Sequence, residues 1–97
     1  MEYRDYIIIL YDYYGELFND KQKRYFEDYY FSNLSLGEIA ENYNVSRNAV
    51  YKQIQITINK LKEYEEKLQL FEKKTILENI INSINDKKII EDLTKVL

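Results

Sequence analysis

The feature that most restricts how this sequence can fold is the scarcity of residues that interrupt helices. Its 97 residues include no proline and only two glycines, Gly15 and Gly37. Hairpins and tight turns usually rely on these residue types, because glycine tolerates positive φ and proline fixes φ. Helices joined by short polar turns are therefore favoured, and we predict an all-α fold.

A chain of this length forms one domain, here residues 1–97, whose hydrophobic core is only slightly larger than a stable fold requires. Apolar residues recur at three- and four-residue spacing in several segments, which is the pattern of a helix with one buried face. This pattern predicts helices over about residues 3–18, 20–31, 35–44 and 47–73, followed by two shorter helices near the C-terminus.

Capping signals mark where most of these helices begin. In a capping box, two side chains three residues apart bond to backbone N–H groups at a helix start. Three pairs fit this pattern: Asn19 with Gln22, Ser35 with Glu38, and Thr75 with Glu78. Ser46 is a further N-cap, Asn85 or Asp86 caps the last helix, and Asn44 can adopt the left-handed conformation that ends a helix.

Two of the capped helices stand only a few residues apart, which requires a sharp turn and is typical of a helix-turn-helix. We place this motif at residues 35–58. Ala40 is small enough for the two helices to cross closely. The predicted core of the motif consists of Ile39, Ala40, Val45, Val50 and Ile54.

The opposite side of the second motif helix is polar and has the chemistry of a DNA contact. The predicted DNA-binding residues are Ser46, Arg47, Asn48, Tyr51, Lys52 and Gln55. Arginine can pair with guanine, asparagine or glutamine with adenine, and lysine with phosphate. The alternative is that the motif is only a scaffold and that these residues form an ordinary solvated helix face.

The charge distribution agrees with a nucleic-acid contact in the middle of the chain, although the total charge is −3. Residues 21–62 contain seven basic and four acidic side chains. The basic surplus is therefore confined to the segment that contains the predicted motif.

The tyrosines cluster at residues 11–14 and 25–30. Such clusters can stack on the bases of single-stranded nucleic acid. Aromatic residues at helical spacing are more typical of a core, however, and the adjacent carboxylates would repel phosphate. We therefore interpret the tyrosines as core residues.

The absence of cysteine and histidine removes thiol chemistry, the usual metal ligands and the commonest general base. We expect no enzymatic activity, no metal site and no cofactor. The longest apolar run of the N-terminal segment, residues 7–10, is far too short for a signal peptide or a membrane span. We therefore expect a cytoplasmic protein with no membrane partner.

The fourth predicted helix is too long for a globule of this size. Its 27 residues would span ~40 Å, against a globule diameter of ~26 Å. Apolar residues occupy heptad a and d positions along it, at Ile54, Thr57, Leu61, Tyr64, Leu68 and Phe71. We predict a head of residues 1–60, a tail of residues 61–97 for packing or dimerisation, and a homodimer whose seam includes Leu61, Leu68 and Phe71.

Four blocks of the sequence together resemble the YlxM-like family of small bacterial helix-turn-helix proteins. They are residues 19–26 with Tyr29 and Tyr30, residues 34–41, residues 45–51 and residues 64–68. The resemblance covers roughly residues 9–71. It implies a fold similar to the fourth region of sigma factors, without a wing, and a DNA-facing position for Arg47, Asn48, Tyr51 and Lys52. Gln55 and Ile56 depart from the Lys-Arg pair of many relatives, which removes two phosphate contacts.

The same resemblance implies genes linked to the signal recognition particle pathway and a regulatory role in that pathway. The rival interpretation is a non-enzymatic accessory of the signal recognition particle. In that case the acidic, tyrosine-rich first helix would dock on the particle's protein or RNA. Salt-dependent binding of duplex DNA distinguishes the two, because phosphate contacts release counterions.

Overall fold

Six α-helices and one 3₁₀ turn make up the computed structural model, which describes all 97 residues. In chain order they are α1 (Tyr3–Tyr14), η1 (Gly15–Leu17), α2 (Asp20–Tyr30), α3 (Leu36–Tyr43), α4 (Arg47–Leu68), α5 (Leu70–Asn82) and α6 (Lys87–Thr94). The structure contains no strand, which confirms the predicted all-α fold. None of the helices is both long and apolar enough to cross a membrane.

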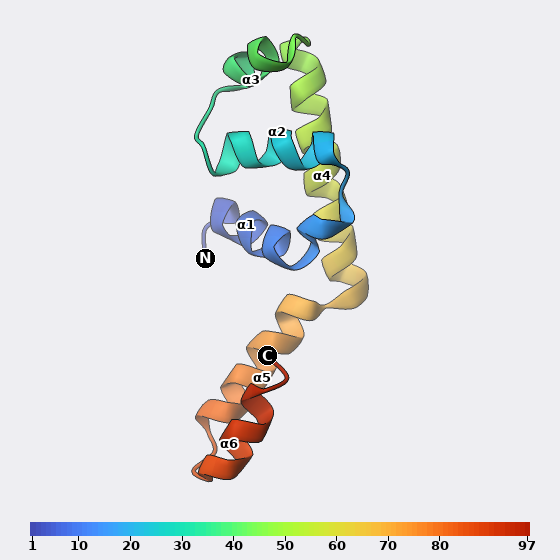
Figure 1. Cartoon of the computed structure of the whole chain (residues 1–97). Coiled ribbons are helices and arrows are strands. Elements are labelled where there is room, and N and C mark those ends of the chain that lie inside the picture. The colour runs from blue at the N-terminus through green and yellow to red at the C-terminus, as the bar shows by residue number, and fades with distance from the viewer.

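The helices form two groups that follow one another along an elongated molecule (Figure 1). α1, α2 and α3 stack along one side of α4, and we call this group the α1–α4 bundle. α5 and α6 run antiparallel beyond the end of α4, and we call residues 70–97 the α5–α6 hairpin. The molecule measures 56 × 25 × 23 Å, and its radius of gyration is 17.3 Å. A compact domain of this size has a radius of gyration of ~13 Å.

The hydrophobic core lies entirely within the α1–α4 bundle. Its 13 residues come from α1 to α4 and from the turn before α2, and the largest fully buried ones are Tyr14 and Phe26. The rings of Tyr11 and Phe26 stack with centroids 4.1 Å apart. Burial of one such large apolar side chain contributes about 1.5–3 kcal/mol, so these residues dominate the stability of the bundle.

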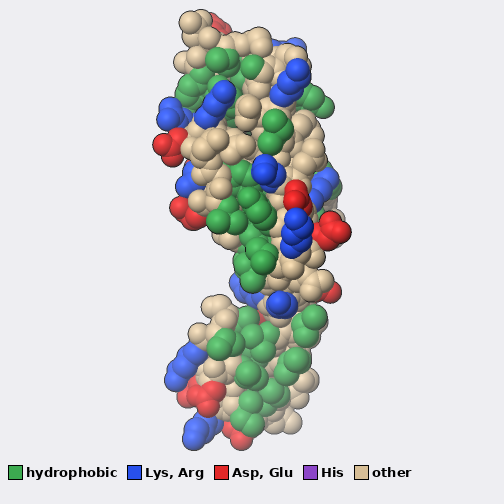
Figure 2. Space-filling model, turned by 90° about the vertical axis from the view of Figure 1, so that its right-hand side faces the viewer, with side chains coloured by type: hydrophobic (Ala, Val, Ile, Leu, Met, Phe, Trp, Pro, Cys, Tyr) green, Lys and Arg blue, Asp and Glu red, His purple; other side chains and the backbone are tan.

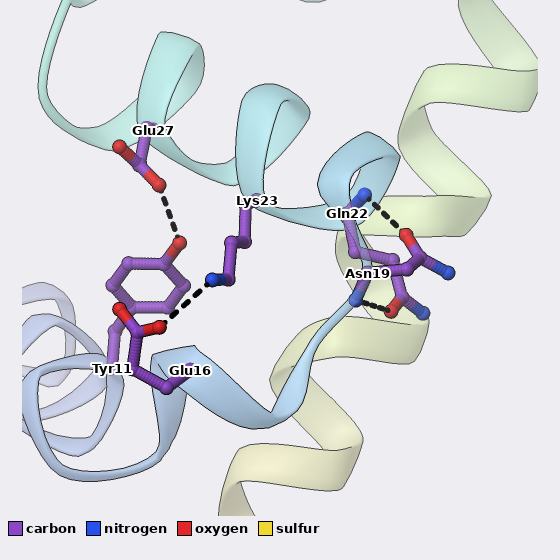
Figure 3. A network of polar contacts seen from close by, with 6 residues as sticks. All are labelled: Tyr11, Glu16, Asn19, Gln22, Lys23 and Glu27. Carbon is purple, nitrogen blue, oxygen red and sulfur yellow. Dashed lines mark hydrogen bonds and ion pairs between the residues drawn. The ribbon is translucent and has the colours of Figure 1, made fainter.

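The tyrosines of the two predicted clusters lie in this core or pack against it, and two of them donate hydrogen bonds to carboxylates. Tyr11, Tyr14 and Tyr25 are buried. Tyr11 Oη donates to Glu27 Oε2 at 2.6 Å, next to the Lys23–Glu16 ion pair (Figure 3). Burial and this hydrogen bond both raise the pKa of Tyr11, so its hydroxyl stays protonated. The interpretation of the tyrosines as core residues is confirmed.

The first helix is shorter than the sequence predicts. α1 ends at Tyr14, and the tighter 3₁₀ turn η1 occupies the next three residues. The change of helical period turns Leu17 outward, where it is 59% exposed, whereas Phe18 is buried. α2 agrees with its prediction to within one residue at its end.

Two of the three predicted capping boxes are confirmed. Asn19 and Gln22 form one at the start of α2, visible in Figure 3, and Ser35 and Glu38 form the other at the start of α3. The third is wrong, because Thr75 lies inside α5 and its hydroxyl donates to the carbonyl of Phe71 at 3.0 Å.

The fourth helix does not continue to residue 73. α4 ends at Leu68, and Gln69 adopts the left-handed conformation with φ 54° and ψ 35°. The reason is the buried carboxylate of Glu65, which accepts hydrogen bonds from the backbone N–H groups of Phe71 and Glu72, each at 3.2 Å. These bonds satisfy the free N–H groups at the start of α5 and make the break favourable without glycine or proline.

Tyr14 completes the junction between the two groups of helices. Its hydroxyl donates to Glu65 Oε1 at 2.6 Å and accepts from the N–H of Leu70 at 3.2 Å. Burial, together with the hydrogen bond to Glu65, raises the pKa of Tyr14 to about 12. We call Tyr14, Glu65 and the backbone of residues 70–72 the junction. It fastens the start of α5 to α1 and α4.

The predicted dimer seam is wrong for Leu61, because this residue is fully buried inside the α1–α4 bundle. Phe71 is half-buried, and its ring lies 6.0 Å from that of Tyr6 and 6.2 Å from that of Tyr13. Leu68 remains 46% exposed. The break after α4 brings α5 back against α1, so the single long seam predicted from the heptads does not exist.

The last two helices have no residue in the core. Asp86 caps α6, accepting hydrogen bonds from the N–H groups of Lys88 at 2.9 Å and Ile89 at 3.2 Å, which confirms one of the two predicted caps. Neither α5 nor α6 contains a buried residue. Their apolar side chains are therefore exposed or only half-buried in the single chain.

Candidate nucleic-acid interface

α3 and α4 are separated by only three residues, and local hydrogen bonds fix the turn between them. Asn44 ends α3 with φ 55° and ψ 46°, the left-handed conformation predicted for it. The N–H of Val45 then donates to the carbonyl of Ala40 at 3.0 Å, a bond that closes many helix ends. Ser46 begins α4, and its hydroxyl accepts from the N–H of Ala49 at 3.0 Å. The result is a helix-turn-helix whose second helix is the start of α4.

Four of the five predicted motif-core residues lie in the hydrophobic core: Ile39, Ala40, Val50 and Ile54. Val45 differs, because its side chain is 38% exposed. Its contribution to the turn comes from its backbone N–H, which bonds to Ala40, and the left-handed residue before it turns its side chain outward. The position is therefore a turn residue and not a core residue.

The six predicted DNA-contact residues lie together at the start of α4, and we call them the polar face. It consists of Ser46, Arg47, Asn48, Tyr51, Lys52 and Gln55. All are exposed except Gln55, which is half-buried. Val50 and Ile54 of the same helix are buried on the opposite side, so the core fixes the direction in which the polar face points.

A shallow hollow adjoins the polar face. It has a volume of about 460 Å³ and is lined by Leu36 from α3 and by Arg47, Asn48 and Tyr51 from α4. Leu36 was not among the predicted site residues. Its half-buried side chain lines the hollow from the α3 side, and its position directly after the Ser35 cap is the local signal that could have identified it.

The positive charges of the polar face are directed to solvent. The four ion pairs of the chain are elsewhere: Lys23 with Glu16, Lys67 with Glu63, Lys74 with Glu78, and Lys95 with Asp92. From Ser46 to Lys62 no acidic residue occurs. An anionic partner would therefore meet Arg47 and Lys52 without a neighbouring carboxylate on the same helix segment.

Comparison with known proteins shows one family across nearly the whole chain. The model of the UPF0122 family, described as "Putative helix-turn-helix protein, YlxM / p13 like", matches residues 1–96. A UPF0122 protein of Halalkalibacterium halodurans is 44% identical over 92 residues, which cover 91% of this chain and 84% of the relative.

Two further relatives show a similar degree of likeness. A UPF0122 protein of Malacoplasma penetrans is 40% identical over 87 residues, which cover 90% of this chain and 81% of the relative. A UPF0122 protein of Bacillus velezensis is 55% identical over 64 residues, which cover 66% of this chain and 58% of the relative.

Proposed function

The chain belongs to the YlxM / p13-like family of helix-turn-helix proteins, and on that premise we propose that it binds double-stranded DNA through the polar face. The observation that carries the proposal is the placement of Arg47 and Lys52. Both are exposed at the start of the second motif helix, in a segment without acidic residues. A second motif helix of this kind enters the major groove with its N-terminal residues.

The residues of the polar face have different roles in this proposal. Arg47 stands in the first turn of α4 and pairs with the N7 and O6 atoms of a guanine. Asn48 is suited to an adenine. Lys52, one turn further along, contacts a phosphate through its flexible ammonium group. The positive end of the α4 dipole at Ser46 adds to the attraction for phosphate.

A single copy of this motif makes few phosphate contacts, so its affinity for DNA at cellular salt is low. Gln55 and Ile56 add no charge to the face. We propose that the protein acts as a homodimer that places two polar faces on two half-sites. Half-sites about 34–36 Å apart would lie on the same side of the duplex.

The resemblance to the YlxM-like family suggests what the binding is for. We propose a regulator of genes of the signal recognition particle pathway, which acts where bacterial DNA is found, in the cytoplasm. The resemblance is the support for this part of the proposal, and the geometry of the polar face supports only the DNA contact.

One observation favours a second candidate, an accessory that docks on a protein or RNA of the signal recognition particle. Residues 1–17 expose four acidic side chains, Glu2, Asp5, Asp12 and Glu16, on a chain of net charge −3. This acidic surface would suit a basic protein partner and would repel nucleic acid. Its helix-turn-helix would then be a scaffold.

Titration of a random-sequence duplex at low and high salt tests the two candidates. We expect binding of the parent protein to weaken as the salt concentration rises. In Lys52→Ala, the slope of the logarithm of the binding constant against the logarithm of the salt concentration should fall by about one unit, because one phosphate contact is lost. Lys88→Ala is the matched control, since it removes an exposed lysine from α6. Parent protein that shows no salt-dependent binding would contradict the DNA proposal and favour the docking candidate.

A further inference from the structure

The α5–α6 hairpin has an apolar surface that the chain itself does not cover. Six large apolar side chains on it are exposed: Leu70, Ile76, Ile80, Ile89, Val96 and Leu97. Others, such as Leu77 and Leu93, are only half-buried. Figure 2 shows hydrophobic side chains gathered along one face of this part of the molecule, with charged side chains at its margin.

Such a hairpin cannot be stable on local interactions alone. α6 has eight residues, and isolated helices shorter than ~12–15 residues are marginal in water. α6 packs on α5, and α5 contacts the bundle through α1 and through the hydrogen bonds of the junction with α4. The free energy that holds both helices must therefore come largely from burial of their apolar faces, and burial requires another surface.

The charge of the hairpin indicates what kind of surface it meets. Residues 70–97 contain five acidic and five basic side chains, namely Glu72, Glu78, Asp86, Glu91, Asp92, Lys73, Lys74, Lys87, Lys88 and Lys95. A balanced surface of this kind has no net attraction for nucleic acid or for an anionic membrane. A second copy turned through a two-fold axis presents the same mixture, so opposite charges can pair around an apolar centre.

The apolar character of the hairpin also fits a second copy. The hairpin, whose helices have 13 and 8 residues, exposes six large apolar side chains. Homodimer interfaces are more apolar than other protein interfaces. Two such hairpins packed face to face would form a four-helix bundle, which buries both apolar faces at once.

We propose that the α5–α6 hairpin is a self-association surface that pairs with the same hairpin of a second copy. Ile76 and Ile80 are both exposed on it, one turn apart on α5. The proposal moves the dimer seam away from α4, where Leu61 is buried, to the end of the molecule opposite the polar face (Figure 1). It does not depend on DNA binding, because the polar face takes no part in it.

Sedimentation of the full chain without DNA, from low to high micromolar concentration, tests the proposal. We expect the parent protein to dimerise. The double variant Ile76→Glu, Ile80→Glu should raise the dissociation constant at least about tenfold, because it places unpaired charges in the apolar contact. Leu17→Glu is the matched control, since Leu17 is an apolar residue of similar exposure outside the hairpin. It should dimerise like the parent.

Hydrogen exchange of the parent protein tests the same surface without a substitution that could unfold the hairpin. Amides of α5 and α6 should exchange more slowly as the protein concentration rises, while those of α2 stay unchanged. A parent chain that sediments as a monomer throughout would overturn the proposal. Exchange in α5 and α6 that is independent of concentration would do so as well. Both measurements contain no DNA, so their outcome is separate from that of the DNA titration.

Discussion

The α1–α4 bundle and the α5–α6 hairpin are built from similar amphipathic helices, yet only the bundle contains buried side chains. All 13 core residues belong to the bundle or its turns, and none belongs to the hairpin. The bundle satisfies its apolar pattern within the chain, whereas the hairpin presents the same pattern to solvent. An apolar stripe in a sequence therefore predicts a helix, but it does not predict whether the covering surface comes from the same chain.

The largest effect on the free energy of unfolding is expected when a core side chain of the bundle is removed. Phe26→Ala should lower the free energy of unfolding by about 3–5 kcal/mol, because it removes a fully buried ring and leaves a cavity beneath Tyr11 and Tyr30. Urea unfolding followed by circular dichroism measures it. A loss below about 1 kcal/mol would mean that the bundle is not the stable part of the molecule.

The helix-turn-helix itself should be sensitive to added volume. Ala40→Leu should cost about 1–3 kcal/mol, because Ala40 is buried where α3 packs on α4. Ala49→Leu is the control, since Ala49 lies on α4 of the same motif but is only half-buried. Thermal melts of the two variants should differ clearly. Equal melting temperatures would show that the crossing at Ala40 is not tight.

The junction links the two regions, and removal of its charge should loosen the hairpin first. Glu65→Gln should cost about 1–3 kcal/mol, because the amide group accepts fewer hydrogen bonds from Tyr14 and from the start of α5. Glu66→Gln makes the same chemical change on an exposed neighbour and should be neutral. Urea titrations that do not separate the two variants would contradict the role of the junction.

The smallest effect is expected in the hairpin. Ile80→Ala in the monomer should change the free energy of unfolding by no more than about 0.5 kcal/mol, because Ile80 is exposed and loses little burial. The measurement is a urea titration in dilute protein, where sedimentation shows no dimer. A loss as large as that of Phe26→Ala would place Ile80 in an intramolecular core and remove the contrast between the two regions.

Local signals in the sequence were sufficient to predict most helix starts and the turn of the motif. The box formed by Ser35 and Glu38 and the left-handed Asn44 depend only on residues a few positions apart, and both are confirmed. Burial of Ile39, Val50 and Ile54 follows from helical periodicity in the same way.

The features that the sequence did not predict depend on contacts between distant residues. α4 ends at Leu68 because Glu65 is held by Tyr14, which lies 51 positions earlier in the chain. Periodicity alone could not show this contact, so the heptads suggested an unbroken helix and a seam that included Leu61. The exposed side chain of Val45 has a similar cause, since a backbone bond to Ala40 sets the turn.

The central claim is that the polar face at the start of α4 contacts DNA, and NMR mapping tests it most directly. Amide shifts of ¹⁵N-labelled protein would be followed while a short duplex is added at low salt. We predict that the largest changes fall on residues 46–55 and on the adjoining start of α3. Arg47→Ala should reduce those changes. The difference in binding free energy between preferred and other duplexes should also fall by about 1–3 kcal/mol in this variant. Shifts concentrated on the acidic residues of α1, or no shifts at all, would contradict the claim.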